Sequence, residues 1–292
     1  MAASRPLERT LRAAHRPSTR WLAVALLALA LPATAVGMRE DVLRVPVVAG
    51  LEQAYIDVTV FRPPGEGPFP LLVLSHGSPR SAEDRRSAGR QRLAAQSERF
   101  VAMGFAVVVP TRRGYGESGG RWAEAYGTCA EPDYHAAGLE TARDLKAAVD
   151  VVRGESWADA SRIVLAGQSA GGFGSVAASA TAFPGLVGVV NFAGGRGSTG
   201  PDQVCGEERL IEAMSRYGSA ARVPELWIYS RNDRFFGPAL ARRMHDAFVA
   251  AGGVAEFVEA PPTGLDGHGY FARAMEDWTP RVEDFLTRIG AR

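Results

Sequence analysis

A serine flanked by glycines is the residue of this chain best suited to covalent chemistry. Residues 163–172 read IVLAGQSAGG, an apolar run that ends in G-x-S-x-G with Ser169 at its centre. This pattern predicts a buried strand, a tight turn and a helix, with the serine hydroxyl exposed above the end of the strand. The glycines are expected because the turn brings the helix backbone close to the strand. Ser169 is therefore the candidate nucleophile of an acyl-transfer reaction.

The base and the acid that such a serine requires are expected from two later loops. Asp233 follows one predicted strand, and His268 lies in a glycine-rich loop after the last predicted strand. An imidazole removes the serine proton, and a carboxylate fixes the imidazole tautomer. We therefore predict a triad of Ser169, His268 and Asp233. Asp266, two residues before the histidine, is the alternative acid, although its position favours a role in capping its own loop.

The oxyanion that forms during acyl transfer needs two backbone N–H donors. Ala170, directly after the nucleophile, supplies one of them. The segment H-G-S-P at 76–79 follows another predicted strand. We expect the Ser78 N–H to be the second donor, because Pro79 has no N–H. His76 in the same segment is interpreted as a structural residue.

The elements that must position these loops alternate between strand and helix patterns. Such alternation predicts a mostly parallel central sheet with helices on both faces, in which ligands bind at the carboxyl ends of the strands. We expect one α/β domain over residues 36–292. Its strands are predicted at 43–61 (a pair), 71–74, 105–109, 163–168, 186–192, 225–229 and 254–258, with a long helix at 133–152.

These segments together resemble the α/β-hydrolase superfamily, within the group of dienelactone-hydrolase-like and prolyl-oligopeptidase-like serine hydrolases. The resemblance implies the hydrolase fold and a Ser-His-Asp mechanism that uses no metal and no cofactor. Dienelactone hydrolases proper use a cysteine nucleophile, and haloalkane dehalogenases and epoxide hydrolases use an aspartate, so Ser169 argues against those activities. The matching motifs are H-G-S-P at 76–79, R-G-Y-G-E-S at 113–118, G-Q-S-A-G-G at 167–172, N-D at 232–233 and G-H-G at 267–269.

Residues that could line a substrate pocket follow the strand predicted at 105–109. Arg113 and Tyr115 lie on a loop expected to face the site, beside Arg112, and Trp122 is close behind. An arginine there can bind a substrate carboxylate with two hydrogen bonds. The alternatives are an arginine paired with a nearby acid and aromatic rings that only pack in the core. We expect Arg113, Tyr115 and Trp122 to contact substrate.

The chain has two cysteines, Cys129 and Cys205. In an exported protein an even pair favours one disulfide, with two free buried thiols as the alternative. Cys205 falls in the segment 194–222, where members of the resembled superfamily commonly place a cap. This segment is short and has a helical pattern at 209–216, so we expect a small cap and a fairly open cleft. A bridge would tie it to the loop around Cys129 and shape the entrance.

The first 35 residues have the pattern of an export signal. A basic stretch precedes the apolar run at 21–31, and P-A-T-A at 32–35 places a cleavage site after Ala35. The apolar run is about half the length that a membrane span needs, so an uncleaved anchor is the weaker alternative. We therefore predict a periplasmic or secreted protein with no stable membrane span after cleavage.

Composition excludes two further classes. A hydrophobic fraction of 46% is enough for a sizeable core and argues against disorder. Residues 1–35 contain five basic residues and one acidic residue, which leaves 28 basic and 31 acidic residues in the body of the chain. A mildly acidic body has no electrostatic basis for binding nucleic acid.

The sequence therefore predicts an exported serine hydrolase that cleaves small-molecule carboxylic esters, similar to a carboxylesterase. A serine peptidase and an acyltransferase are the alternative enzymes, since both use the same triad. The sequence shows no cluster of acids for a peptide amine, which argues against the peptidase. A non-catalytic binding protein is the alternative from another class, and the complete triad argues against it.

Overall fold

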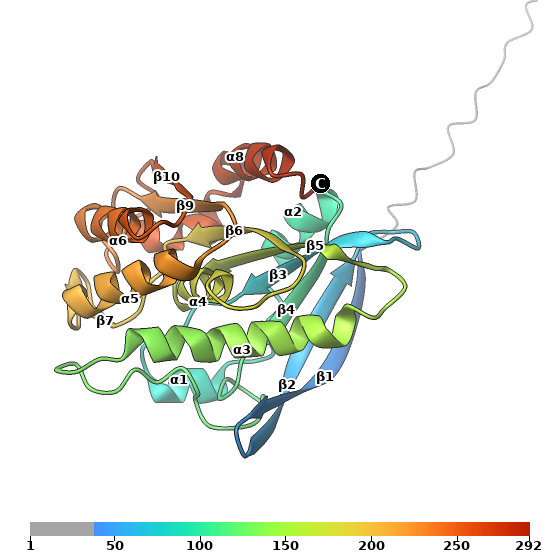
Figure 1. Cartoon of the computed structure of the whole chain (residues 1–292), viewed down its shortest axis with the longest axis horizontal. Helices are drawn as coiled ribbons and strands as arrows, with labels where there is room; N and C mark the ends of the chain where they lie inside the picture. Colours follow the sequence, from blue (N-terminus) through green and yellow to red (C-terminus); the bar gives the residue numbers. More distant parts are fainter. Residues whose placement is uncertain (1–37) are drawn as a thin grey trace, which may run out of the picture. The chain divides into compact units, whose positions relative to one another are not determined.

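An eight-stranded sheet organises residues 38–292, which are the residues that the computed structural model describes (Figure 1). The strand order is β1-β2-β4-β3-β5-β6-β9-β10, with β2 antiparallel to both β1 and β4 and every other pair parallel. The prediction of a mostly parallel sheet is confirmed, whereas the predicted leader at 1–35 lies outside the described residues. The strands are β1 (Arg39–Ala49), β2 (Glu52–Arg62), β3 (Phe69–Ser75), β4 (Ala106–Thr111), β5 (Ala158–Gln168), β6 (Leu186–Phe192), β9 (Glu225–Ser230) and β10 (Ala255–Ala260).

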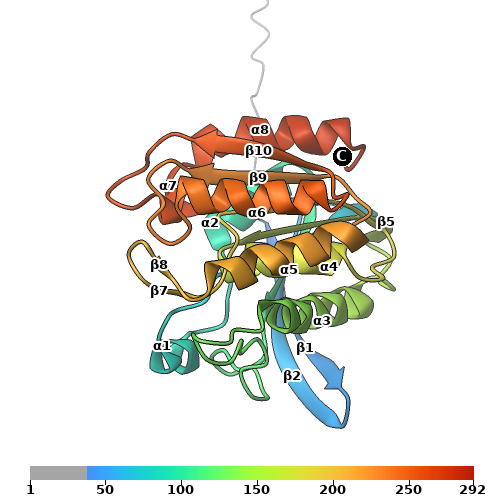
Figure 2. The same ribbon diagram turned by 60° about the vertical axis from the view of Figure 1, so that its left-hand side comes forward.

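Helices cover both faces of this sheet (Figures 1 and 2). The alternation of β5 shows why, because Ile163 and Leu165 pack on one side of the sheet and Val164 and Ala166 on the other. One face carries α3 (Tyr134–Val152), α4 (Ala170–Ser179), α5 (Glu207–Ala220) and α6 (Pro238–Ala250), and the other carries α2 (Ala94–Ala102) and α8 (Met275–Arg288). No helix in the range 38–292 is both long enough and apolar enough to cross a bilayer.

The segment 194–222 contains a short β-ribbon followed by a helix that packs on the sheet. A small ribbon of β7 (Ser198–Gly200) and β8 (Gln203–Val204) comes first. In the following α5, Leu210, Met214 and Tyr217 are fully buried in the main apolar cluster. The helix therefore belongs to the layer that covers the sheet, and the start of the segment, residues 195–198, lines the pocket beside Ser169.

Candidate active site

Ser169 lies on the turn between β5 and α4. Its backbone has φ +57° and ψ −124°, a left-handed conformation that a residue with a side chain adopts only at a cost. The turn is held by a hydrogen bond of 2.9 Å from the Ser169 N–H to the Phe192 carbonyl of β6. A Cβ on Gly171 would come within 2.2 Å of the Ser75 carbonyl oxygen, and one on Gly167 within 2.5 Å of the Gly171 backbone. Both glycines are thus required by close approach of the helix to the strands.

His268 and Asp233 meet across two loops at the carboxyl end of the sheet. The Nδ1 atom of His268 lies 3.0 Å from Asp233 Oδ2. The other carboxylate oxygen accepts the N–H groups of Phe235 at 2.7 Å and Phe236 at 2.9 Å, and the Asp233 side chain is fully buried. These donors hold the carboxylate in place, and its second oxygen orients the Nδ1 edge of the imidazole. The Nε2 atom of His268 is then the ring nitrogen that remains to act as a base.

Asp266 binds the backbone of the histidine loop and does not bind the imidazole ring, in contrast to Asp233. Its side chain accepts the N–H of His268 at 2.9 Å and the N–H of Arg234 at 3.0 Å. It thereby caps the short 3-10 turn η1 (Gly267–Gly269), which carries the histidine. The Asp266 carboxylate holds the backbone of the loop, whereas the Asp233 carboxylate holds the ring.

The loop of His268 is fixed against the nucleophile turn. Gln168, the residue before Ser169, donates from Nε2 to the His268 carbonyl at 3.0 Å. The imidazole stacks on Phe235, with ring centres 3.9 Å apart and planes 7° apart. Ser169 and His268 line the same open cleft, of about 360 Å³. The structure therefore brings the predicted nucleophile, base and acid to one place.

The two predicted oxyanion donors also lie beside Ser169. Ala170 is the first residue of α4, where N–H groups have no acceptor within the helix. Ser78 and Ala170 line a common pocket with Ser169. Both residues therefore border the space beside the nucleophile, where the oxyanion donors of an acyl transfer are required.

His76 has the structural role that the sequence favoured. Its Nδ1–H donates to the Gly77 carbonyl at 2.7 Å, and its Nε2 accepts the Arg112 N–H at 3.2 Å. Burial, and then the charge of Arg112, lower the pKa of His76 to about 3. The ring is neutral at neutral pH, and it packs edge-on against Tyr115. His76 thus links two of the loops that form the site.

Arg112 belongs to a buried cluster with Glu124 and Arg196. Both arginines donate to the Glu124 carboxylate, and the side chains of all three are at most 2% exposed. Burial opposes ionisation of Glu124, but the charges of Arg112 and Arg196 outweigh it and lower its pKa to about 2. We call these three residues the pocket-side cluster, because Arg196 also lines the pocket that contains Ser169.

The expectations for Arg113 and Tyr115 require correction. Arg113 is buried and donates to Asp144 and Glu140, so that it faces α3 and does not line either of the clefts that contain Ser169. Tyr115 is fully buried and accepts the indole N–H of Trp122 at 3.1 Å. Both residues turn inward because each finds a partner there. Of the three predicted contacts, Trp122 alone lines the pocket.

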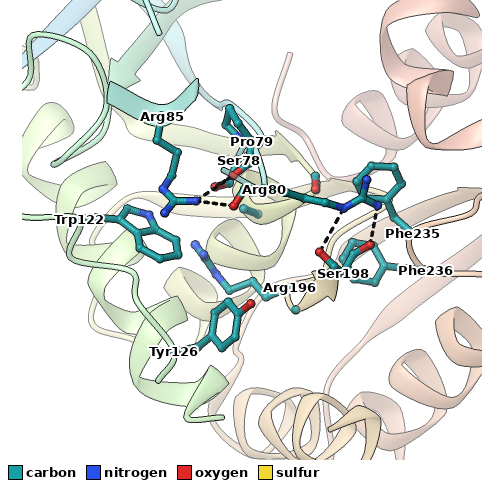
Figure 3. Close-up of a pocket in the computed structure, with 14 residues that line it drawn as sticks. Ser78, Pro79, Arg80, Arg85, Trp122, Tyr126, Arg196, Ser198, Phe235 and Phe236 are labelled. Atoms are coloured by element: carbon teal, nitrogen blue, oxygen red, sulfur yellow. Dashed lines mark hydrogen bonds between the residues drawn. The ribbon is translucent and has the colours of Figure 1, made fainter. Parts of the chain in front are cut away.

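The pocket beside Ser169 contains residues that the sequence reasoning missed (Figure 3). Arg80 directly follows the H-G-S-P segment, so its distance along the chain from Ser78 was an available signal. Arg196 follows β6 at the start of the segment 194–222. The sequence indicates that this segment lies near the site, but no local pattern distinguishes Arg196 within it. Arg85 lies on the short helix α1 (Ala82–Ser87), outside the motifs, so no sequence pattern marks it as a pocket residue.

A disulfide joins Cys129 to Cys205, as the pair of cysteines predicted. Cys129 follows Glu124 by five residues, and Cys205 follows Arg196 by nine. The bridge therefore connects the two chain segments that supply the pocket-side cluster. The hydroxyl of Tyr134 donates to the Cys205 carbonyl and attaches the same segment to α3.

The sheet order and the serine turn define the class of the protein, which is an α/β-hydrolase-fold serine hydrolase. The chain belongs to the X-Pro dipeptidyl-peptidase (S15) family, whose profile matches residues 53–223. This confirms the resemblance inferred from the motifs. No curated protein sequence matches the chain significantly.

Solved structures with the same fold include peptidases and an esterase. Acylaminoacyl peptidase from Pyrococcus horikoshii is 16% identical with a TM-score of 0.64, and the match covers 86% of this chain and 42% of that one. An esterase from Pyrococcus furiosus is 15% identical with a TM-score of 0.59, covering 86% and 90% of the two chains. Dipeptidyl peptidase 4 from Porphyromonas gingivalis is 14% identical with a TM-score of 0.63, covering 86% and 35%. This chain thus spans about two fifths or less of the two peptidases and most of the esterase.

Proposed function

We propose that the protein hydrolyses carboxylic esters through an acyl-enzyme, with Ser169, His268 and Asp233 as its triad. The observation that carries this proposal is the 3.0 Å contact between His268 Nδ1 and Asp233 Oδ2 beside a serine held in a left-handed turn. Neither cleft that contains Ser169 is lined by an aspartate or glutamate of the described range 38–292. A site without acids favours esters over peptide substrates that must be held by a protonated amino terminus.

In the first half of the reaction, Ser169 Oγ attacks the ester carbonyl while its proton passes to His268 Nε2. The carbonyl oxygen becomes an oxyanion that accepts the N–H groups of Ala170 and Ser78. The imidazolium is stabilised by the carboxylate of Asp233, which two backbone N–H groups hold in position. When the tetrahedral intermediate collapses, the alkoxide leaves with the proton from Nε2, and the acyl group remains on Oγ.

In the second half, a water molecule takes the place of the leaving alcohol. His268 Nε2 accepts its proton, and the hydroxide attacks the acyl carbonyl. Collapse of this intermediate breaks the bond to Oγ, which recovers the proton from Nε2. The products are the alcohol, the carboxylic acid and free enzyme.

The direct test is hydrolysis of 4-nitrophenyl esters from acetate to palmitate, together with labelling by a fluorophosphonate. Ser169→Ala is expected to lower kcat by about 10⁴-fold or more and to abolish labelling. The two acids give a matched pair. Asp233→Asn is expected to cost about 10⁴-fold in kcat because the imidazole adopts the wrong tautomer. Asp266→Asn keeps a side-chain oxygen that can cap the loop, so it is expected to leave kcat nearly unchanged. Equal losses in the two variants would contradict the assignment of the acid.

A peptidase is the second candidate, and the family match supports it. Peptide cleavage by removal of a dipeptide requires a group that holds the amino terminus. The observed clefts offer arginines instead of acids. Cleavage of an Ala-Pro-4-nitroanilide more efficiently than of 4-nitrophenyl butyrate would establish the peptidase and overturn the ester proposal.

We further propose that the protein acts in an oxidising compartment, in the periplasm or outside the cell. The Cys129–Cys205 bridge supports this, since structural disulfides persist where thiols are not kept reduced. The test is fractionation of cells that express the full chain, with the mass of the mature protein showing whether residues 1–35 have been removed. A cytoplasmic, full-length product would contradict this proposal.

A further inference from the structure

The pocket beside Ser169 is lined by three arginines, Arg80, Arg85 and Arg196, and by no acidic residue of the described part of the chain. In Figure 3 the guanidinium groups of Arg85 and Arg196 lie on the side of Trp122, and Arg80 lies on the opposite side against Phe235. The pocket holds about 70 Å³, the volume of a few water molecules. Such a pocket fits a small anionic group.

The charges of these arginines are not balanced by the protein. Within residues 38–292, neither Arg80 nor Arg85 has a carboxylate within salt-bridge distance. Arg80 donates to the carbonyl and hydroxyl of Ser198, and Arg85 donates to the carbonyls of Pro79 and Arg80. All of these acceptors are neutral.

Arg196 has only a share of a counter-ion. Glu124 is divided between Arg196 and Arg112, so the pocket-side cluster carries a net positive charge. The side chain of Arg196 is only 2% exposed, and its Nε atom is buried without an acceptor. Charged groups that are buried without full compensation are costly, and a bound anion would reduce that cost.

The arginines are also held in a form that suits a carboxylate. The guanidinium of Arg85 stacks on the Trp122 ring at 3.7 Å, and that of Arg80 stacks on Phe235 at 3.8 Å. Stacking fixes the planar group by its face and leaves donors on its edge for a second partner. Arg85 is nine-tenths buried, so little side-chain entropy remains to be lost on binding.

The position of His268 distinguishes the two sides of the nucleophile. His268 lines the larger open cleft and does not line the arginine pocket. The leaving alcohol must lie near the imidazole that protonates it, so the alcohol is assigned to the open cleft and the acyl chain to the arginine pocket. We propose that the acyl group of the substrate is short and ends in a carboxylate, as in the half-ester of a short dicarboxylic acid. This inference rests on the proposed ester hydrolysis.

The experiment compares 4-nitrophenyl hydrogen glutarate with its uncharged methyl ester, each corrected for the rate measured with Ser169→Ala. The two substrates differ in one charge at the end of the acyl chain. Hydrogen bonds between arginine and a carboxylate predict a kcat/KM that is about 10- to 100-fold higher for the anion. High salt is expected to lower this ratio, because it screens the arginines.

Variants separate this pocket from the charge of the whole protein. Arg80→Gln and Arg85→Gln are each expected to lower the ratio of the two kcat/KM values by about 10-fold. Loss of Arg85 also removes its hydrogen bond to the Pro79 carbonyl and can disturb that loop. The side chain of Arg80 is exposed, so Arg80→Gln tests the pocket without this structural effect. Arg242→Gln is the matched control, since Arg242 also stacks on a ring, that of Phe257, but lines neither cleft. An equal loss in Arg242→Gln would overturn the assignment.

Binding to Ser169→Ala, measured by calorimetry with monomethyl glutarate and dimethyl glutarate, distinguishes failure of this inference from failure of the proposed reaction. Equal, Ser169-dependent hydrolysis of both esters would overturn the carboxylate pocket and leave ester hydrolysis standing. Selective binding of the anion without hydrolysis of either ester would support the pocket and overturn the reaction. Absence of both hydrolysis and selective binding would overturn both.

Discussion

Arg112 and Arg113 are neighbours in the chain but belong to two clusters with different charge balance. Arg112 shares one glutamate with Arg196 in the pocket-side cluster, which is cationic. Arg113 pairs with two acids, Asp144 and Glu140, and Glu140 also pairs with Arg143. We call this group of two arginines and two acids the helix-side cluster. The first cluster borders the pocket of Ser169, and the second attaches the loop to α3. Of the two clusters, the one with an excess of positive charge is therefore the one beside the nucleophile.

The acids of the two clusters respond to this balance in opposite directions. The pKa of Glu124 is lowered to about 2, because the attraction of Arg112 and Arg196 exceeds the effect of burial. The pKa of Asp144 is raised to about 6, because burial exceeds the effect of its contacts with Arg113. An acid shared by two buried arginines, such as Glu124, therefore differs in its electrostatics from Asp144, which has a single arginine partner.

The largest effect that tests this comparison is expected from Glu124→Gln. The change leaves two buried guanidinium groups without a counter-ion, and breaking such pairs costs about 3–5 kcal/mol of the free energy of unfolding. Glu140→Gln in the helix-side cluster is the control, since Glu140 is 29% exposed and its loss is expected to cost less than about 1 kcal/mol. Urea denaturation measures both values. Similar losses would show that the two clusters are not distinct.

A smaller effect is expected from the double variant Cys129→Ser and Cys205→Ser. The bridge closes a loop with a sequence separation of 76 residues, and bridges of this kind contribute about 2–4 kcal/mol. Because it connects the segments of Glu124 and Arg196, its loss is also expected to reduce the preference for the anionic ester. Denaturation and the ratio of the two kcat/KM values measure these effects. An unchanged ratio would show that the pocket-side cluster keeps its geometry without the bridge.

The smallest effect is a difference in pH dependence between the two clusters. Glu124 has a pKa below its ordinary value of 4.5, so its contribution is present above pH 4.5 and is lost as the pH falls toward about 2. Asp144 has a pKa above its ordinary value of 3.8, so its contribution is present below pH 3.8 and is lost as the pH rises through about 6. The measurement is the free energy of unfolding between pH 2.5 and 7. Glu124→Gln is expected to lack the increase seen as the pH rises from 2.5, and Asp144→Asn is expected to lack the decrease seen near pH 6. Parallel profiles for wild type and both variants would contradict these signs.

Much of the fold was predictable because strands and helices leave local patterns. The predicted strand at 186–192 has the same bounds as β6, and the predicted helix at 133–152 differs from α3 only in that Asp133 is its N-cap. The predicted strand at 71–74 is longer in the structure, where Pro70 and Phe69 also pair with β5. The helix expected at 209–216 is present as α5, but it packs on the sheet and does not form a cap, a difference that only tertiary packing decides.

The sequence by itself determined the positions of the nucleophile turn and of the loops that carry Asp233 and His268. These depend on short-range rules, because glycines permit the close approach and parallel strands place their following loops at one edge. The tertiary structure alone decided that Arg196 faces the pocket and that Arg113 faces α3. Their partners lie far along the chain, with Glu124 separated from Arg196 by 72 residues and Asp144 from Arg113 by 31. A buried charge is placed by the counter-ion that folding brings to it, and no local pattern records that partner.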